Sequence, residues 1–246
     1  MKIGLYGDSY GVTNNLDTSW PRLLSKKLNC IVDNYSVSGG SVYSTYSSFI
    51  ETCQNYDLVI FLVTDPLRYP VEVDFSDNIH PAARRVGGLA IVDNLRIRFK
   101  DKLTALDKQL LDDVEGWYRA SHLPYVQLVT ELFLDKVLSL HPNVILYPCF
   151  ESSVSDKHAN GIDTKYCLFN LFVRQLKELG FPMNIDSIIY AGGNENTNVI
   201  SGHLVPEFNA AFAELMYNRI KHNKWDFNLI DQVPLLEYPR EHYYLG

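Results

Sequence analysis

The chain has 246 residues, 46% of them hydrophobic and 21% charged, which is typical of a globular protein long enough for one large domain. Its 22 basic and 29 acidic side chains give a net charge of −7 at pH 7, which argues against general nucleic-acid binding because that requires a basic surface. The longest apolar run, residues 58–63, is too short to cross a membrane, so we expect no membrane partner.

Apolar runs predict five strands, and helical periodicity predicts helices between them. The predicted strands are Lys2–Tyr6, Cys30–Val32, Leu58–Val63, Val144–Pro148 and Ser187–Tyr190. The predicted helices are Trp20–Leu28, Tyr43–Asn55, Lys102–Leu140 in two or more pieces, Lys165–Leu179 and Pro206–His222. This alternation predicts one three-layer α/β/α domain over residues 1–222, with a mostly parallel five-stranded sheet.

Two segments stand outside this alternation. The first, residues 66–140, is an elaboration of the fold. Residues 66–100 are rich in Asp, Arg and Pro, which predicts a long loop that passes over the edge of the sheet. Residues 102–140 are amphipathic, which favours packing on the core over binding of a partner. Residues 223–246 form an aromatic tail, which predicts a segment packed on the surface or an arm to another subunit or a virion partner.

The cysteines and the N-terminus indicate the compartment. Four widely spaced cysteines without a Cys-x-x-Cys pair, and seven scattered histidines, predict free thiols, no metal site and no cofactor. The sequence begins within its first predicted strand, which predicts no signal peptide and a soluble cytoplasmic protein. A virus-encoded protein released by lysis fits equally well.

The most informative stretch is Gly7-Asp8-Ser9, which follows the first predicted strand and precedes Gly11. Glycines on both sides of a serine allow a sharp turn that leaves the hydroxyl facing a cleft. Ser9 is therefore a candidate nucleophile if a base reaches it. The alternative is a strand-ending turn, because Gly, Asp and Ser are common turn residues.

Two later stretches supply what such a serine needs. A small-residue loop at 34–41 contains Gly39, and His203 lies just ahead of the last predicted helix, where it could accept the proton of Ser9. His80 is a second candidate base. Ser9, Gly39 and Thr64 each follow a predicted strand, and the carboxyl ends of parallel strands share one edge. This edge is the predicted site.

The order of serine, glycine loop and histidine resembles the SGNH/GDSL hydrolase family, as does the helix start Trp20-Pro21-Arg22-Leu23-Leu24. The resemblance implies a flavodoxin-like fold, Ser9 as nucleophile, His203 as base, and an oxyanion hole made by the backbone N–H groups of Ser9 and Gly39. Many members are encoded by bacteriophages, which would fit a phage origin here.

The sequence departs from the family pattern at two places. Thr64 stands where the family has an oxyanion-binding Asn, so its hydroxyl would be the third donor. Ile200 stands where the family has the Asp that orients the histidine. Nearby polar residues that could replace this Asp are Asn198, Ser201 and Glu195.

Two charged residues follow the third predicted strand. The resemblance implies that Asp65 caps the turn. Arg68 has no family counterpart, and it either holds an anionic substrate group or pairs with Asp65 or Asp74. The structural pairing is favoured.

Two functions follow from these observations. The first is a serine esterase that acts on a small ester or an O-acetylated carbohydrate through a Ser9–His203 dyad and an acyl-enzyme. The second is a catalytically decayed binding or structural protein on the same fold, such as a virion or host-interaction component.

Overall fold

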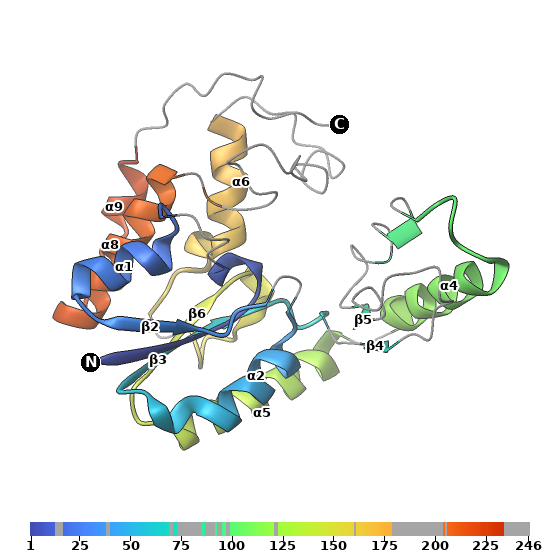
Figure 1. Cartoon of the computed structure of the whole chain (residues 1–246), viewed down its shortest axis with the longest axis horizontal. Coiled ribbons are helices and arrows are strands. Elements are labelled where there is room, and N and C mark those ends of the chain that lie inside the picture. Colours follow the sequence, from blue (N-terminus) through green and yellow to red (C-terminus); the bar gives the residue numbers. More distant parts are fainter. Residues whose placement is uncertain are drawn as a thin grey trace.

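The fold has helices on both faces of a parallel sheet, giving three layers (Figure 1). The computed structural model describes residues 1–12, 17–37, 40–68, 71–72, 85–86, 92, 95–96, 99–120, 123–159, 161–178, 204 and 206–233. Within these residues the parallel sheet has four strands rather than the predicted five. The fifth predicted strand, 187–190, lies outside the described residues.

The four strands run in the order β2-β1-β3-β6, and every neighbouring pair is parallel. Their bounds are β1 Lys2–Tyr6, β2 Ile31–Asn34, β3 Leu58–Val63 and β6 Val144–Pro148. The chain moves from β1 to β2 on one side and then crosses to β3 on the other. In such sheets a ligand binds at this switch point, beyond the carboxyl ends of the strands, here β1 and β3.

The side chains of strand β3 are divided between two buried apolar clusters, one on each face of the sheet. Its alternate side chains Val59, Phe61 and Val63 belong to one buried cluster, whereas Ile60 and Leu62 belong to the other. Alternation arises because successive side chains of a strand point to opposite faces. A central parallel strand is buried on both faces, which explains its continuous apolar run.

Different helices cover the two faces of the sheet, as the ribbons in Figure 1 show. One face is covered by α1 Trp20–Leu28, α6 Leu168–Glu178, α8 Pro206–His222 and the short α9 Asn228–Asp231. The other is covered by α2 Val42–Thr52 and α5 Leu123–Leu140, which pack on each other.

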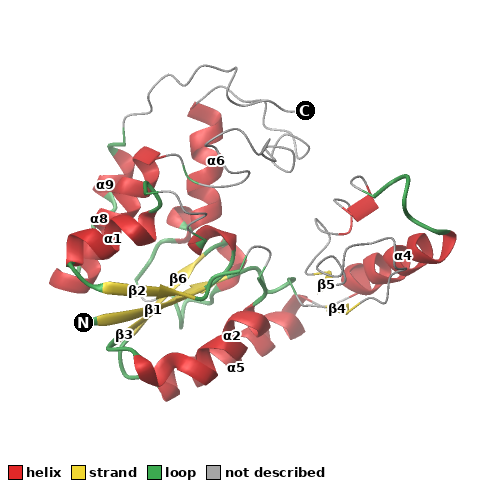
Figure 2. Ribbon diagram, viewed as in Figure 1, coloured by secondary structure: helices red, strands yellow, loops and turns green. Residues whose placement is uncertain are grey.

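The elaboration lies apart from the three layers (Figure 2). It contains α4 Ala105–Ala120 and the antiparallel pair β4 Val71–Glu72 and β5 Arg85–Val86. Helix α4 begins later than the predicted Lys102, because Thr104 and Asp107 form reciprocal hydrogen bonds that cap its first turn. The elaboration has a small apolar cluster of its own, formed by Val92, Leu95, Leu111, Val114 and Tyr118.

The first part of the aromatic tail packs on the core. The ring of Phe227 stacks on Tyr166 at a centroid distance of 4.1 Å, and Trp225 packs edge-to-face on Tyr147 at 5.6 Å. The rest of the tail, residues 234–246, lies outside the described residues, and the contact of the tail with another subunit or a virion partner stays a prediction.

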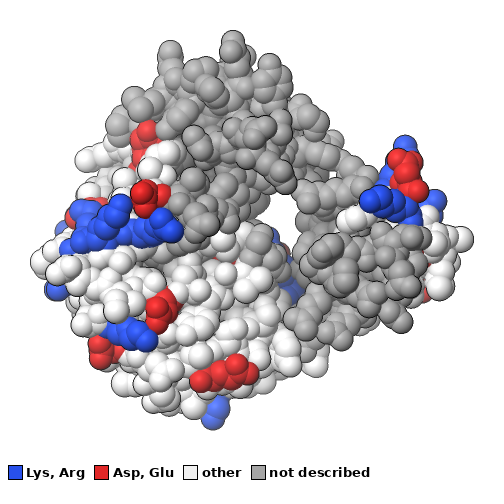
Figure 3. Space-filling model, viewed as in Figure 1, with Lys and Arg blue, Asp and Glu red and all other residues white. Residues whose placement is uncertain are grey.

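Two features are absent from the part of the chain that the structure describes. None of the helices placed by the structure is long and apolar enough to span a membrane, and the same residues contain no group of three His, Cys, Asp or Glu side chains that could hold a metal ion. On the face shown in Figure 3, basic and acidic side chains lie among one another rather than in one large basic area.

Candidate active site

The turn that carries Ser9 is built by its neighbours. Strand β1 ends at Tyr6, and residues Ser9–Gly11 form a 3₁₀ helix whose N-cap is Asp8, with Oδ1 of Asp8 accepting from the N–H of Tyr10 at 3.1 Å. Asp8 and Tyr10 are buried, whereas Ser9 between them is partly exposed. The predicted nucleophile is thus the residue of this turn that reaches the surface.

The second predicted loop packs directly against this turn. The N–H of Val37 donates to the carbonyl of Gly7 at 3.0 Å, and Nδ2 of Asn34 donates to the carbonyl of Gly11 at 2.7 Å. A methyl group on Gly40 would lie 2.9 Å from the carbonyl oxygen of Val37 and 3.2 Å from that of Gly7, and the first contact is too short for any residue but glycine. The loop is therefore bonded to the chain on both sides of Ser9, at Gly7 and Gly11, whereas Gly39 itself lies outside the described residues.

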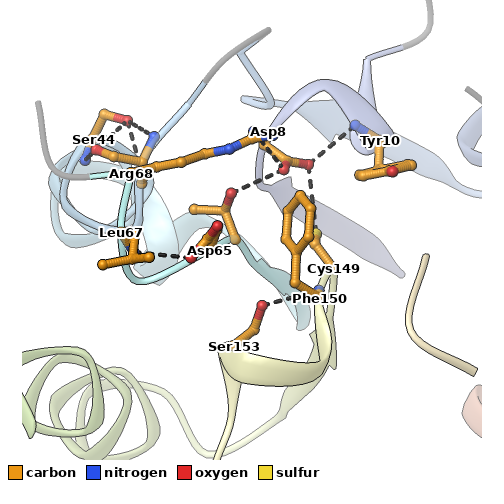
Figure 4. A network of polar contacts seen from close by, with 11 residues as sticks. Asp8, Tyr10, Ser44, Asp65, Leu67, Arg68, Cys149, Phe150 and Ser153 are labelled. Atoms are coloured by element: carbon orange, nitrogen blue, oxygen red, sulfur yellow. Dashed lines mark hydrogen bonds and ion pairs between the residues drawn. The ribbon is translucent and has the colours of Figure 1, made fainter. Parts of the chain in front are cut away.

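A buried carboxylate lies immediately before Ser9. Asp8 is fully buried, and its Oδ2 accepts from the hydroxyl of Thr64 at 2.9 Å and from Nη1 of Arg68 at 3.2 Å. Figure 4 shows Asp8 contacted by Arg68 from the loop after β3, by Cys149 after β6 and by Tyr10 of its own turn. A buried carboxylate needs such partners, because an unpaired charge in the protein interior destabilises the fold by about several kcal/mol. Removing one partner of a buried ion pair has a cost of the same order.

The thiol of Cys149 completes this network. Cys149 follows β6, and its Sγ donates to Oδ1 of Asp8 at 3.5 Å. Burial and, second, the neighbouring Asp8 carboxylate raise the pKa of Cys149 well above its usual range. The thiol is therefore neutral near pH 7 and serves as a weak donor rather than as a competing nucleophile.

The partner of Arg68 differs from the sequence prediction. Arg68 pairs with Asp8 rather than with Asp65, and the other predicted partner, Asp74, lies outside the described residues. Asp65 instead accepts from the N–H of Leu67 at 2.9 Å, and the carbonyl of Asp65 accepts from the N–H of Arg68, so that Asp65 organises the turn after β3. Sequence reasoning missed Cys149 and the pairing with Asp8, because both contacts join residues at least 60 positions apart.

Hydrogen bonds connect the backbone just after His203, the predicted base, to the backbone just after Ser9, the predicted nucleophile. Leu204 is buried, and its carbonyl accepts from Nδ2 of Asn209 at 2.6 Å. Oδ1 of Asn209 accepts from the backbone N–H of Trp20 at 3.0 Å, and Nε1 of Trp20 donates to the carbonyl of Tyr10 at 2.8 Å. Three hydrogen bonds therefore link the residue after position 203 to the residue after Ser9.

The other predicted residues of this region lie outside the described residues. They are His203 itself, the candidate base His80, Ile200, and the candidate orienters Asn198, Ser201 and Glu195.

The segment after β6 is held at its far end by His158. This side chain is almost fully buried, its Nε2 lies 2.9 Å from Oδ1 of Asp135 on α5, and its Nδ1 lies 3.4 Å from Oγ of Ser155. Lys157 also contacts Asp135, with Nζ at 2.7 Å from both carboxylate oxygens. Asp135 thus fixes to α5 the segment that brings Cys149 to Asp8.

We expect Asp135→Asn to lower the melting temperature at neutral pH. Hydrogen bonds from Lys157 and then His158 hold the pKa of Asp135 below its usual range. A lowered pKa contributes stability that is present above the unfolded value, about 3.9, and is lost as the pH falls through the folded value. The difference between wild type and variant should therefore shrink below about pH 4. Thermal unfolding from pH 7 to pH 3 checks this, with exposed Asp156→Asn as control; a constant difference would contradict it.

No family model and no curated protein matches the sequence. The solved structures that are similar to this chain include a psychrotrophic esterase from a Pseudoalteromonas species (TM-score 0.39, 14% identity, covering 90% of this chain and 97% of that one), a putative lipolytic protein of the G-D-S-L family from Desulfitobacterium hafniense (0.38, 15%, 87% and 95%), and an acetyl xylan esterase (0.45, 13%, 89% and 100%). At these identities, the candidate site depends on the geometry of this chain alone.

Proposed function

We propose that the protein is a serine hydrolase that cleaves a small ester or an O-acetylated carbohydrate. The observation that carries the proposal is the partly exposed Ser9 on a tight turn, linked through Trp20 and Asn209 to the residue that follows His203. A serine hydroxyl at neutral pH needs a neighbouring base, and histidine suits this role because its usual pKa is near neutrality.

The proposed reaction has two steps. His203 takes the proton of Ser9 while Oγ of Ser9 attacks the ester carbonyl, and the alcohol leaves with that proton to give an acyl-enzyme. Water then attacks the acyl-enzyme by the same route and releases the acid. The backbone N–H groups of Ser9 and Gly39 are the proposed donors to the oxyanion.

A fluorophosphonate probe tests this proposal, because it forms a stable adduct with a serine whose hydroxyl is activated. We expect covalent labelling at Ser9, located by peptide mass spectrometry, together with hydrolysis of a short-chain aryl ester. Exposed Ser152 serves as the internal control, since it should stay unlabelled. A chain that neither reacts with the probe nor hydrolyses the ester would refute the hydrolase.

A catalytically decayed binding protein on the same fold is the second candidate function. The observation that favours it is the position of Thr64, which is fully buried and whose hydroxyl donates to Asp8. A hydroxyl has one proton to donate, so Thr64 cannot serve Asp8 and an oxyanion at the same time. Absence of probe labelling, with unchanged folding, would be the result that this candidate predicts.

Asn209 should position the proposed base. We expect Asn209→Ala to lower kcat by about 10- to 100-fold with little change in KM, because a displacement of about 1 Å in a catalytic group has effects of this size. The substitution removes both the donor to Leu204 and the acceptor for Trp20. Lys221→Ala, at an exposed position of the same helix, is the matched control. Unchanged kcat in Asn209→Ala would contradict this role.

The missing orienter gives a gain-of-function test. If Ile200 occupies the place of the family's Asp, Ile200→Asp should raise kcat, because a carboxylate stabilises the imidazolium and fixes its tautomer. Melting temperature is measured alongside, since a charge at a packed position would cost stability. Unchanged rate with unchanged stability would mean that another residue already orients His203. Substitutions of Asn198, Ser201 and Glu195 would then identify it.

A further inference from the structure

The proposed reaction lacks a side-chain donor for the oxyanion at the position where one is expected. Thr64 follows β3 at that position, but it is fully buried and donates its hydroxyl to Oδ2 of Asp8. The buried carboxylate of Asp8 is also unfavourable for a second negative charge, because like charges repel strongly where water is excluded. A cation beside Asp8 would supply the missing donor and would also offset the negative charge of the Asp8 carboxylate.

Arg68 is held at that place from two sides. Its Nη1 lies 3.2 Å from Oδ2 of Asp8, and its guanidinium carbon lies 4.9 Å from the centroid of the Phe150 ring. The Phe150 ring is itself supported by edge-to-face packing on Tyr10 and by stacking on Phe169. Figure 4 shows the Arg68 side chain extending from the loop after β3 to the carboxylate of Asp8, beside the Phe150 ring.

Arg68 also has the capacity for a further partner. A guanidinium carries five N–H donors in a rigid plane, and among the described residues its one hydrogen bond goes to Asp8. About a quarter of the side chain remains exposed, although Asp8 beneath it is fully buried. The charge is therefore fixed at the boundary between the buried network and the partly exposed Ser9 turn.

We propose that Arg68 is a catalytic residue that donates a hydrogen bond to the oxyanion in place of Thr64. This inference rests on the proposed function. When Oγ of Ser9 bonds to the carbonyl carbon, the π electron pair moves to the carbonyl oxygen, and Arg68 shares its N–H with that oxygen without transferring the proton. When the intermediate collapses, the electron pair returns and the bond to the departing alcohol breaks.

The placement favours this role over recognition of an acidic group on the substrate. Asp8, which holds the guanidinium, directly precedes Ser9 in the chain, so the cation is paired with the residue next to the nucleophile. A residue that binds a remote carboxylate would instead stand away from the reacting carbonyl. The two roles predict different kinetics.

The first test compares a neutral ester, 4-nitrophenyl acetate, with an acidic one, mono-4-nitrophenyl succinate. We expect Arg68→Met to lower kcat for both esters to the same extent, by about 100-fold, as when other oxyanion donors are removed, with little change in KM. A loss confined to the succinate ester and expressed in KM would overturn the inference in favour of carboxylate binding. Full activity of Arg68→Met on both esters would overturn it as well.

The second test separates catalysis from simple neutralisation of Asp8. In the double variant Asp8→Asn/Arg68→Met neither charge remains, so the melting temperature lost in Arg68→Met should be recovered, whereas kcat should stay low. Return of kcat together with the melting temperature would show that Arg68 is only a counter-ion.

In Arg68→Ala, added guanidinium at millimolar concentration should restore part of kcat, and methylammonium at the same concentration should restore less. No rescue, with the variant folded, would contradict the inference.

Failure of the inference is distinguishable from failure of the proposed function. Wild-type labelling and turnover that depend on Ser9, combined with full activity in Arg68→Met, would remove Arg68 alone. A wild-type protein without any Ser9-dependent reaction would overturn both.

Discussion

Ser9→Ala should abolish turnover of a short-chain aryl ester, with a loss in kcat of about 10⁴-fold or more, as is typical when a serine nucleophile is removed. His203→Ala should cause nearly the same loss, because the hydroxyl cannot attack without a base. The double variant should be little worse than either single variant, since residues that act as one unit lose activity together. Initial rates and probe labelling measure all three.

Ser152→Ala is the matched control for this series, because Ser152 is an exposed serine on the segment after β6 and has no place in the proposed chemistry. It should keep wild-type kcat and wild-type labelling. If Ser9→Ala retains turnover above the uncatalysed rate, the nucleophile is another residue. If His203→Ala alone retains it, the base is another residue, and His80 is the next to substitute.

The sheet could be predicted from the sequence because its strands are buried on both faces. Strands β1, β3 and β6 have the predicted bounds, and each is a largely apolar run that is followed by Gly7, Thr64 or Cys149. Strand β2 is an edge strand with partly exposed side chains, so its apolar signal is weaker, and it ends at Asn34, two residues beyond the prediction. The carboxyl edge shared by Ser9 and Thr64 follows directly from this topology.

Capping explains where predicted helix bounds were wrong. Helix α2 begins after Ser41, whose side chain accepts from the N–H of Ser44 while Ser44 bonds back to it. The same arrangement of Thr104 and Asp107 starts α4 three residues after the predicted Lys102. Both starts carry a Ser/Thr-x-x-polar signature that is readable in the sequence.

The polar network around Asp8 could not be predicted in the same way. The sequence identifies Asp8 as a turn residue, and its bond to the N–H of Tyr10 is local. Its partners Thr64, Arg68 and Cys149 come from two other loops, and which side chain reaches which depends on how those loops pack. Sequence spacing predicts an acid close in the chain, Asp65 or Asp74, as the partner of Arg68, because contacts between distant segments are not visible in it. Burial of Asp8 decides the pairing instead, since a fully buried carboxylate requires a cation.

Trp20→Ala should be the most destabilising of the substitutions considered. Trp20 is 2% exposed and packs edge-to-face on Phe212 at a centroid distance of 5.0 Å. Removing a buried tryptophan side chain typically costs about 3–5 kcal/mol through lost burial and the cavity left behind. For a chain of this length that corresponds to a fall in melting temperature of about 6–20 °C, at about 2–4 °C per kcal/mol. Differential scanning calorimetry measures it, and a fall of less than a few degrees would contradict the packing role.

Trp20→Phe separates the packing of this residue from its hydrogen bond. Phenylalanine keeps an aromatic ring against Phe212 but lacks the indole N–H that donates to the carbonyl of Tyr10 at 2.8 Å. Leaving that buried carbonyl without its donor should cost about 1–3 kcal/mol. The same carbonyl belongs to the 3₁₀ helix that starts at Ser9, so kcat should fall by about tenfold while most of the melting temperature is retained. Wild-type kcat in Trp20→Phe would mean that the hydrogen bonds from Leu204 to Tyr10 stabilise the fold without positioning the nucleophile. The evidence for His203 as the base would then come from the His203→Ala kinetics alone.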